Sequence, residues 1–165
     1  MKKFHGSKKI KTAVFISGNG SNLKNLIKFS YFKKSPIEIT LVISNNFKAK
    51  GLNHARKSVI KSKVFLFKNR KNDENKILNF LKKEKINLIC LAGFMRILSK
   101  NFIKKFNGKI LNIHPSLLPK YKGLNTHKRV IQNKEKMSGC TVHFVNSKLD
   151  AGKIIIQKKV KIFKN

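Results

Sequence analysis

Acidic residues, tryptophan, proline and cysteine are all scarce in this chain. Its 165 residues include six Asp and Glu, three Pro, two Cys and no Trp. Cys90 and Cys140 lie singly in apolar segments, which favours buried thiols in a reducing compartment over disulfides. No apolar run approaches the roughly 18 residues of a membrane helix, and the basic N-terminus lacks the apolar region of a secretory signal. We therefore expect a cytoplasmic protein without a membrane partner.

The shortage of acids leaves a formal net charge of +33, because Lys and Arg number 39. Such a charge is typical of nucleic-acid binding. The lysines are spread from end to end, however, and Lys, Asn, Ile and Phe are abundant together, as in a protein encoded by an A/T-biased gene. We therefore favour compositional drift and expect no specific nucleic-acid partner. A basic RNA-binding module is kept as the alternative.

Apolar strand patterns alternate with helical patterns along the chain. We expect strands over residues 11–17, 38–44, 63–67, 86–92, 140–145 and 153–160 and at the start of the stretch 109–123, with helices after residue 22 and over 49–58, 73–83, 99–106 and 126–133. This alternation predicts an α/β class, a doubly wound fold with a mostly parallel sheet. The length suits a single domain at residues 11–165, which follows a basic N-terminal extension at residues 1–10.

The stretch 109–123, KILNIHPSLLPKYKG, changes from apolar to polar and Pro-rich where a strand would end. Residues two apart on a strand face the same way, so Asn112 and His114 are expected to point into one space. Ligands of open α/β sheets bind outside such strand ends. An amide donor beside an imidazole suits acyl-type transfer.

The first expected strand runs directly into Gly18-Asn19-Gly20-Ser21-Asn22 and then into a helical pattern. This arrangement aims backbone N–H groups at an anion, and Ser21 or Asn22 could cap the helix. The loop matches neither GxGxxG nor a P-loop, so a nucleoside triphosphate is not indicated. An ordinary tight turn is the alternative to a phosphate site.

The strand at residues 86–92 ends in GFMRIL, which places Arg96 in an apolar loop. Met95, Ile97 and Leu98 fit core packing and a slot for a flat ring equally well. For Asp150, the residues alone favour a turn role before Gly152.

Isolated histidines are more often structural than catalytic, and we interpret His5, His54 and His127 in this way, whereas His143 is ambiguous. No His, Cys and acid cluster has metal-ligand spacing, so we expect no metal. No nucleophile motif such as GxSxG is present.

Four motifs in this order, SGNGSN, LAGFMRIL, LNIHPSLLPKYKGLNTH and LDAGKIIIQ, resemble those of the phosphoribosylglycinamide formyltransferases, folate-dependent enzymes of purine biosynthesis. The resemblance runs from about Lys11 to the C-terminus. The IHPSLLP and LDAG elements are shared with methionyl-tRNA formyltransferase and formyltetrahydrofolate hydrolase, so these remain alternatives. Those two families normally carry a further domain, at the C-terminus and the N-terminus respectively, that this sequence does not show.

The resemblance implies a role for each motif. It assigns the ribonucleotide phosphate to Gly20, Ser21 and Asn22, the folate to Arg70, Met95, Arg96, Ile97, Leu98 and Asn112, and catalysis to Asn112, His114 and Asp150. It implies 10-formyltetrahydrofolate as co-substrate and direct formyl transfer through a tetrahedral intermediate. Asn112 and protonated His114 would stabilise that intermediate, and Asp150 would favour the charged imidazole.

Members of this family usually continue past the last strand through an acidic helix, whereas this sequence stops at Asn165. We therefore expect a domain without that C-terminal helix, with an uncovered sheet face, lower stability and weaker substrate binding.

Overall fold

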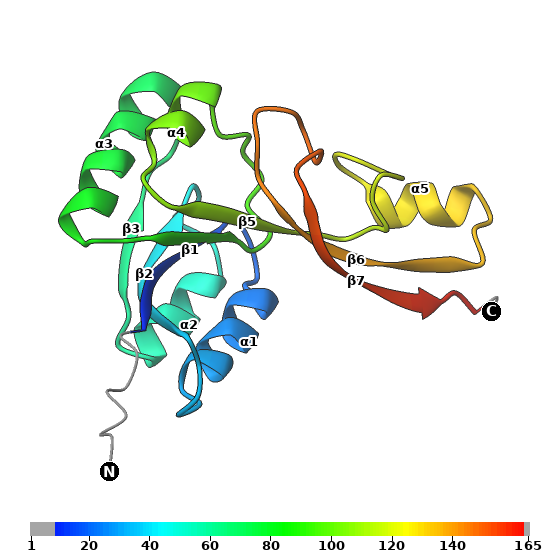
Figure 1. Cartoon of the computed structure of the whole chain (residues 1–165), viewed down its shortest axis with the longest axis horizontal. Coiled ribbons are helices and arrows are strands. Elements are labelled where there is room, and N and C mark those ends of the chain that lie inside the picture. Colours follow the sequence, from blue (N-terminus) through cyan, green and yellow to red (C-terminus); the bar gives the residue numbers. More distant parts are fainter. Residues whose placement is uncertain (1–8, 164–165) are drawn as a thin grey trace, which may run out of the picture.

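The computed structural model describes residues 9–163, which form one seven-stranded sheet with helices on both faces (Figure 1). The strands are β1 (Ile10–Ile16), β2 (Ile37–Ser44), β3 (Lys61–Val64), β4 (Leu88–Leu91), β5 (Lys109–His114), β6 (Met137–Phe144) and β7 (Ile154–Lys161). The helices are α1 (Ser21–Ser30), α2 (Gly51–Lys57), α3 (Arg70–Lys83), α4 (Lys100–Lys105) and α5 (Thr126–Gln132). Most of the predicted N-terminal extension lies outside the described residues.

The strand order β3-β2-β1-β4-β5-β6-β7 confirms the predicted doubly wound, mostly parallel sheet. Strands β1 to β5 are parallel, whereas β6 is antiparallel to β5, and β7 is antiparallel to β6. After β1 the chain continues to β2, toward one edge of the sheet, and after β4 it continues to β5, toward the opposite edge. The adjacent strands β1 and β4 therefore form the switch point where ligands bind in such sheets.

Strand β1 is buried on both faces, and its alternate residues feed two hydrophobic cores. Ala13 and Phe15 belong to the core beneath α3 and α4, whereas Val14 and Ile16 belong to the core beneath α1 and α2. Helices α3 and α4 lie above the sheet in Figure 1, and α1 and α2 lie below it. The near-continuous apolar run of β1 is the pattern expected of a parallel strand covered on both sides.

Several element boundaries differ from the predicted ones, among them the start of β6, which lies at Met137 rather than at residue 140. Helix α3 begins at Arg70 rather than near Asp73, because the side chain of Asn69 accepts a hydrogen bond from the Asn72 N–H and caps the helix earlier. The third strand covers Lys61–Val64 rather than residues 63–67. Phe67 has a φ of 58°, which ends the extended backbone, and its ring packs against the core from a loop.

The helix caps confirm one prediction and correct another. Ser99 caps α4 as predicted, because its hydroxyl accepts from the Phe102 N–H at 3.0 Å. Neither Ser21 nor Asn22 caps α1, because the N-cap position belongs to Gly20 and carries no side-chain hydrogen bond. Gly20 has a φ of 75°, a left-handed conformation that glycine adopts without strain.

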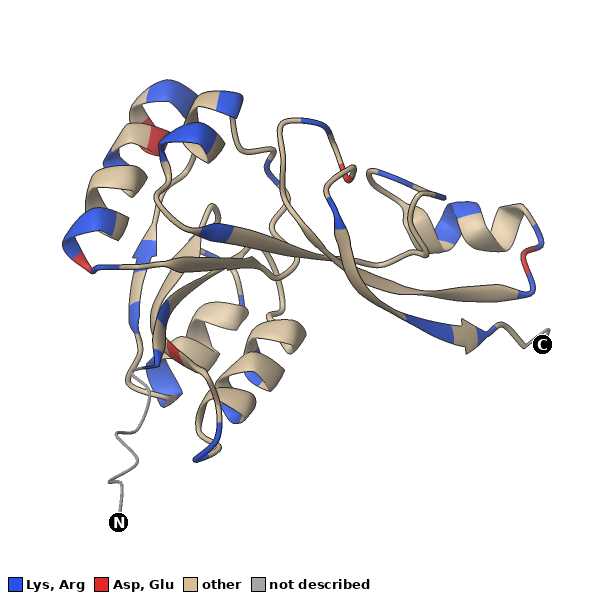
Figure 2. Ribbon diagram, in the orientation of Figure 1, with Lys and Arg blue, Asp and Glu red and all other residues tan. Residues whose placement is uncertain are grey.

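Basic residues occur on helices of both sheet faces and on β7 rather than in one stripe (Figure 2). The edge strand β7 exposes Ile154, Ile155, Ile156 and Val160, each at least 41% accessible. Within residues 9–163, no helix combines the length and the apolar character needed to cross a membrane.

Candidate active site

A serine hydroxyl joins two loops at the switch point. The β1 loop (residues 17–20) follows β1, and the β4 loop (residues 92–99) follows β4. The Ser17 hydroxyl donates to Oδ1 of Asn45 at 2.5 Å and accepts from the Met95 N–H at 2.7 Å. The Asn45 side chain lies just beyond β2, so one hydroxyl fixes three adjacent strand ends relative to one another.

Helix α1 starts at a close contact between two glycines. A Cβ atom on Gly20 would lie 2.6 Å from the Cα of Gly51, so only glycine fits there. The Gly51 N–H donates to the Gly18 carbonyl at 3.0 Å, which fixes the β1 loop against α2. The first N–H groups of a helix have no intrahelical partner, and no acid occupies the first turn of α1. Gly20, Ser21 and Asn22 therefore meet at a place that can hold an anion.

Asn112, His114 and Asp150 come together at the carboxyl end of β5. Nδ1 of His114 lies 3.4 Å from Oδ2 of Asp150, and Nδ2 of Asn112 lies 3.4 Å from Oδ1 of the same carboxylate. Asp150 is in the β6–β7 loop (residues 145–153), where its φ of 45° is left-handed. His114 is 4% exposed, so its contact with the carboxylate is screened little by solvent.

His143 is a fourth member of this cluster. Its Nε2 lies 3.1 Å from Nδ2 of Asn112 and 3.6 Å from Oδ1 of Asp150. The antiparallel pairing of β5 with β6 puts His143 directly opposite Asn112. Asp150 therefore faces two imidazole rings and one amide.

Backbone carbonyls decide where the two imidazoles carry their protons. Nε2 of His114 lies 2.8 Å from the Tyr121 carbonyl, and Nδ1 of His143 lies 2.8 Å from the Phe144 carbonyl. A carbonyl oxygen only accepts, so each of these nitrogens is the donor. The other nitrogen of each ring then faces Asp150, where protonation gives an ion pair.

Burial and hydrogen bonding act in opposite directions on Asp150. Desolvation favours the neutral acid, but hydrogen bonds from His143 and from the Gly123 N–H, at 2.9 Å, and the nearby imidazole charges outweigh it, so the pKa of Asp150 is lowered. The hydrogen bond to Asp150 raises the pKa of His143, against a smaller desolvation effect. Both shifts favour a charged pair.

The segment after β5 is held in place by small polar side chains. The Ser116 hydroxyl donates to the carbonyls of Lys120 and Tyr121, and the Thr141 hydroxyl donates to the Ser116 carbonyl at 2.7 Å. Ser116 and Thr141 are fully buried. These bonds fix the Tyr121 carbonyl that orients His114.

Sequence and structure comparisons agree on one family. The formyl transferase profile matches residues 10–165. The phosphoribosylglycinamide formyltransferase of Haemophilus influenzae is 47% identical over 156 residues, which are 93% of this chain and 74% of that protein. The chain belongs to the formyl transferase family. The resemblance to phosphoribosylglycinamide formyltransferases that its four motifs carry is thereby confirmed.

Two further relatives show how much of such proteins this chain spans. The human trifunctional purine biosynthetic protein adenosine-3 is 46% identical over 158 residues, which are 94% of this chain and 16% of that protein. The crystal structure of phosphoribosylglycinamide formyltransferase from Anaplasma phagocytophilum has a TM-score of 0.88 at 42% identity, covering 95% of this chain and 74% of that one. The chain thus spans about a sixth of the trifunctional relative and about three quarters of the single-function ones.

The predicted folate residues are only partly accessible. Met95 and Ile97 of the β4 loop are 63% and 64% exposed, whereas Leu98 is 6% exposed and packs in the core. Of the two interpretations open for these side chains, Met95 and Ile97 suit a slot and Leu98 suits core packing. Arg96 is exposed. Arg70, in the first turn of α3, contacts Oε1 of Glu74 through Nε at 3.3 Å, and half of its side chain is accessible.

Glu74 anchors the far end of the β4 loop. This carboxylate is 4% exposed, accepts from the Ser99 N–H at 2.7 Å, and is bonded to the Ser99 hydroxyl. Ser17 holds the middle of the same loop at Met95. Neither Ser17 nor Glu74 is predicted as a site residue from the sequence, because nothing local to them shows the loop that they contact.

His143 and the Tyr121 carbonyl are the site groups that sequence reasoning left ambiguous or missed. The pattern CTVHFV indicates a strand, but only its register against β5 shows that His143 meets Asn112. His127 is exposed on α5, His54 lies on α2, and His5 lies outside the described residues. Within residues 9–163, no group of three or more His, Cys, Asp or Glu side chains is arranged to hold a metal.

Proposed function

We propose that this chain transfers a formyl group from 10-formyltetrahydrofolate to the amine of 5'-phosphoribosylglycinamide. The grouping of Asn112, His114 and Asp150 at the carboxyl end of β5 carries the proposal. The names of the relatives support the substrate, because the chain covers most of the single-function enzymes that bear this name.

The reaction forms one C–N bond and breaks another. The neutral amine attacks the formyl carbon, and negative charge develops on the formyl oxygen. The bond from carbon to N10 then breaks, and the proton released by the amine passes to N10. Protonated His114 stabilises the oxyanion electrostatically, and Asp150 at 3.4 Å stabilises the imidazolium charge.

Asn112 needs a free N–H to donate to the oxyanion. In this structure its Nδ2 faces both Nε2 of His143 and Oδ1 of Asp150. Protonation of His143 at Nε2 removes the acceptor, because a protonated ring nitrogen can only donate. Asp150 raises the pKa of His143 and thereby favours the form that releases an Asn112 N–H toward the substrate.

The two loops at the switch point supply the substrate subsites in this proposal. The start of α1 at Gly20, Ser21 and Asn22 binds the ribonucleotide phosphate. Exposed Met95 and Ile97 of the β4 loop line the slot for the folate ring. The net charge of +33 attracts both anionic substrates.

The decisive measurement is release of tetrahydrofolate from 10-formyltetrahydrofolate by the purified chain, with and without the ribonucleotide. We expect release that depends on the ribonucleotide. His114→Ala should lower the rate by about 10²–10³-fold while the ribonucleotide still binds. Release of equal rate without the ribonucleotide would identify a hydrolase, and absence of both release and folate binding would leave the basic RNA-binding alternative.

A further inference from the structure

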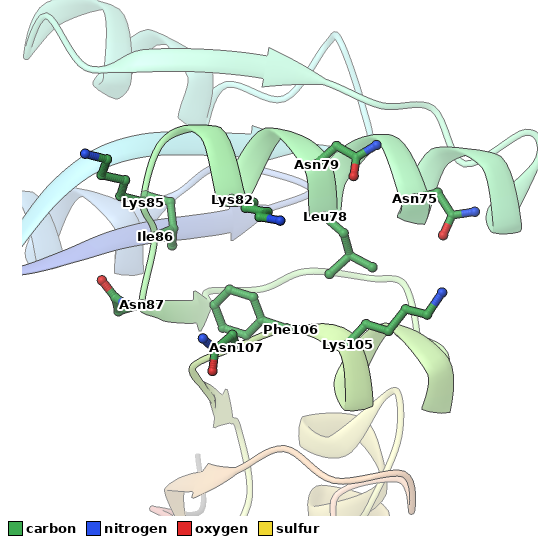
Figure 3. A pocket seen from close by; sticks show the side chains of 10 residues that line it. All are labelled: Asn75, Leu78, Asn79, Lys82, Lys85, Ile86, Asn87, Lys105, Phe106 and Asn107. Carbon is green, nitrogen blue, oxygen red and sulfur yellow. The ribbon is translucent and has the colours of Figure 1, made fainter.

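A cavity of about 770 Å³ lies between the C-terminal half of α3 and the segments that lead into β4 and β5 (Figure 3). Because β4 and β5 begin there, the cavity is at the amino ends of the parallel strands. Asn112 and His114 lie at the carboxyl end of β5. The cavity is therefore separate from the candidate active site.

In the part of the chain that the structure describes, the polar side chains that line this cavity form no side-chain hydrogen bond. Lys82, Lys85 and Lys105 line it together with four asparagines, and no acid is among the lining residues. Within residues 9–163 these three lysines form no ion pair. Glu84, directly after α3, pairs with Lys61 at 2.5 Å, and Glu74 is bonded to Ser99.

Apolar groups form the floor between these polar side chains. Figure 3 shows Leu78 reaching down from α3 toward the segment that carries the Phe106 ring. Leu78 is half-buried, whereas Ile86 and Phe106 are 4% and 8% exposed and belong to the core, so Leu78 supplies most of the accessible floor. Asn87 and Asn107 flank this floor.

We propose that this cavity binds a nucleotide, with the phosphate on the lysines and the base over the apolar floor. Ammonium groups bind phosphate, an apolar floor accepts the face of a base, and asparagine amides match the donors and acceptors of base edges. The volume is in the range of small-ligand sites. A bare phosphate would leave the floor and the amides without a partner.

The lysines have a second possible role, which a test can separate from binding. Lys82 and Lys105 lie in the last turns of α3 and α4, where cations stabilise the helix dipole. If this were their whole role, replacing them would lower the melting temperature and leave nucleotide affinity unchanged.

The experiment is calorimetric titration of the full chain with AMP at low salt. The double variant Lys82→Ala/Lys105→Ala is compared with Lys33→Ala/Lys34→Ala, an exposed pair that removes the same charge elsewhere. We expect the first variant to weaken AMP binding by about tenfold or more, from two lost charge-assisted contacts, and the second to change it less than about twofold. Equal AMP affinity in both variants and the parent, or no AMP binding by the parent, would overturn the proposal.

Further ligands identify the source of the nucleotide. Inorganic phosphate that binds as tightly as AMP would overturn the assignment of a base site. A short single-stranded RNA that binds about tenfold tighter than AMP, with the same loss in Lys82→Ala/Lys105→Ala, would assign the site to a nucleotide within RNA. Equal affinity for both would assign it to a free nucleotide. Formyl transfer by this variant should match the parent, because neither lysine belongs to the candidate active site.

Discussion

Replacing Asp150 by asparagine separates its catalytic role from its role in the turn. Asp150 has a left-handed φ of 45°, which asparagine also tolerates, so the substitution adds no backbone strain. The remaining amide oxygen can still accept from the Gly123 N–H. What is lost is the negative charge that faces His114 and His143.

The structure sets the size of the effect. Two opposite charges 3.4 Å apart interact by about 5 kcal/mol at an effective dielectric constant of about 20. Loss of this interaction can therefore lower the rate by at most about 10³- to 10⁴-fold. Because part of the reaction charge is stabilised by Asn112, we expect kcat to fall by about 10²–10³-fold. The free energy of unfolding should fall by only about 1–2 kcal/mol, the cost of weakened buried hydrogen bonds.

Asn146→Ala is the matched control, because the hydrogen bonds of the Asn146 side chain among residues 9–163 stay within the same loop. Its amide donates to the Ala151 carbonyl at 3.2 Å, and its oxygen accepts from the Lys148 N–H at 2.9 Å. We expect a similar loss of stability with nearly unchanged kcat. Steady-state formyl transfer and urea unfolding measure the two quantities. If folded Asp150→Asn keeps more than about a tenth of the parent kcat, or loses no more activity than Asn146→Ala, Asp150 has only a turn role.

Three further predictions concern the groups around the site. Ser17→Ala should raise the KM for the folate about fivefold, from the loss of about 1 kcal/mol of hydrogen bonding to the β4 loop, and an unchanged KM would refute the coupling. The hydrogen bond to Asp150 raises the pKa of His143 above 6.5. The stability that protonated His143 gives the folded state is therefore complete below pH 6.5 and is lost as the pH rises through the folded-state pKa. The melting temperature of His143→Gln, measured as a function of pH, should lack this decline. If the melting temperatures of the variant and the parent changed in parallel with pH, the prediction would be contradicted. Glu74→Gln should lower the free energy of unfolding by about 1–3 kcal/mol, because the buried bonds to Ser99 lose the charged acceptor, and an unchanged urea midpoint would refute that role.

The fold class and the order of the elements follow from the sequence, because hydrophobic periodicity is local. The β1 segment shows a continuous apolar run, and α1 has apolar residues at helical spacing, which is sufficient to indicate strand and helix. Two of the boundaries that were wrong depended on single residues. The start of α3 was set by the Asn69 cap. The third strand ended at Val64, and the left-handed Phe67 keeps the chain from extending over the predicted residues up to 67.

The candidate site shows the same division between local and long-range information. Asn112 and His114 were predicted to share a space because alternation along one strand is a local property. The charged cluster was decided by the tertiary structure, because the antiparallel register of β5 and β6 brings His143 to Asn112 and the β6–β7 loop brings Asp150. The sequence by itself determined which chemistry was available. Tertiary structure decided which groups meet, because contacts between residues 31 and 38 positions apart depend on strand order and register, which no local pattern encodes.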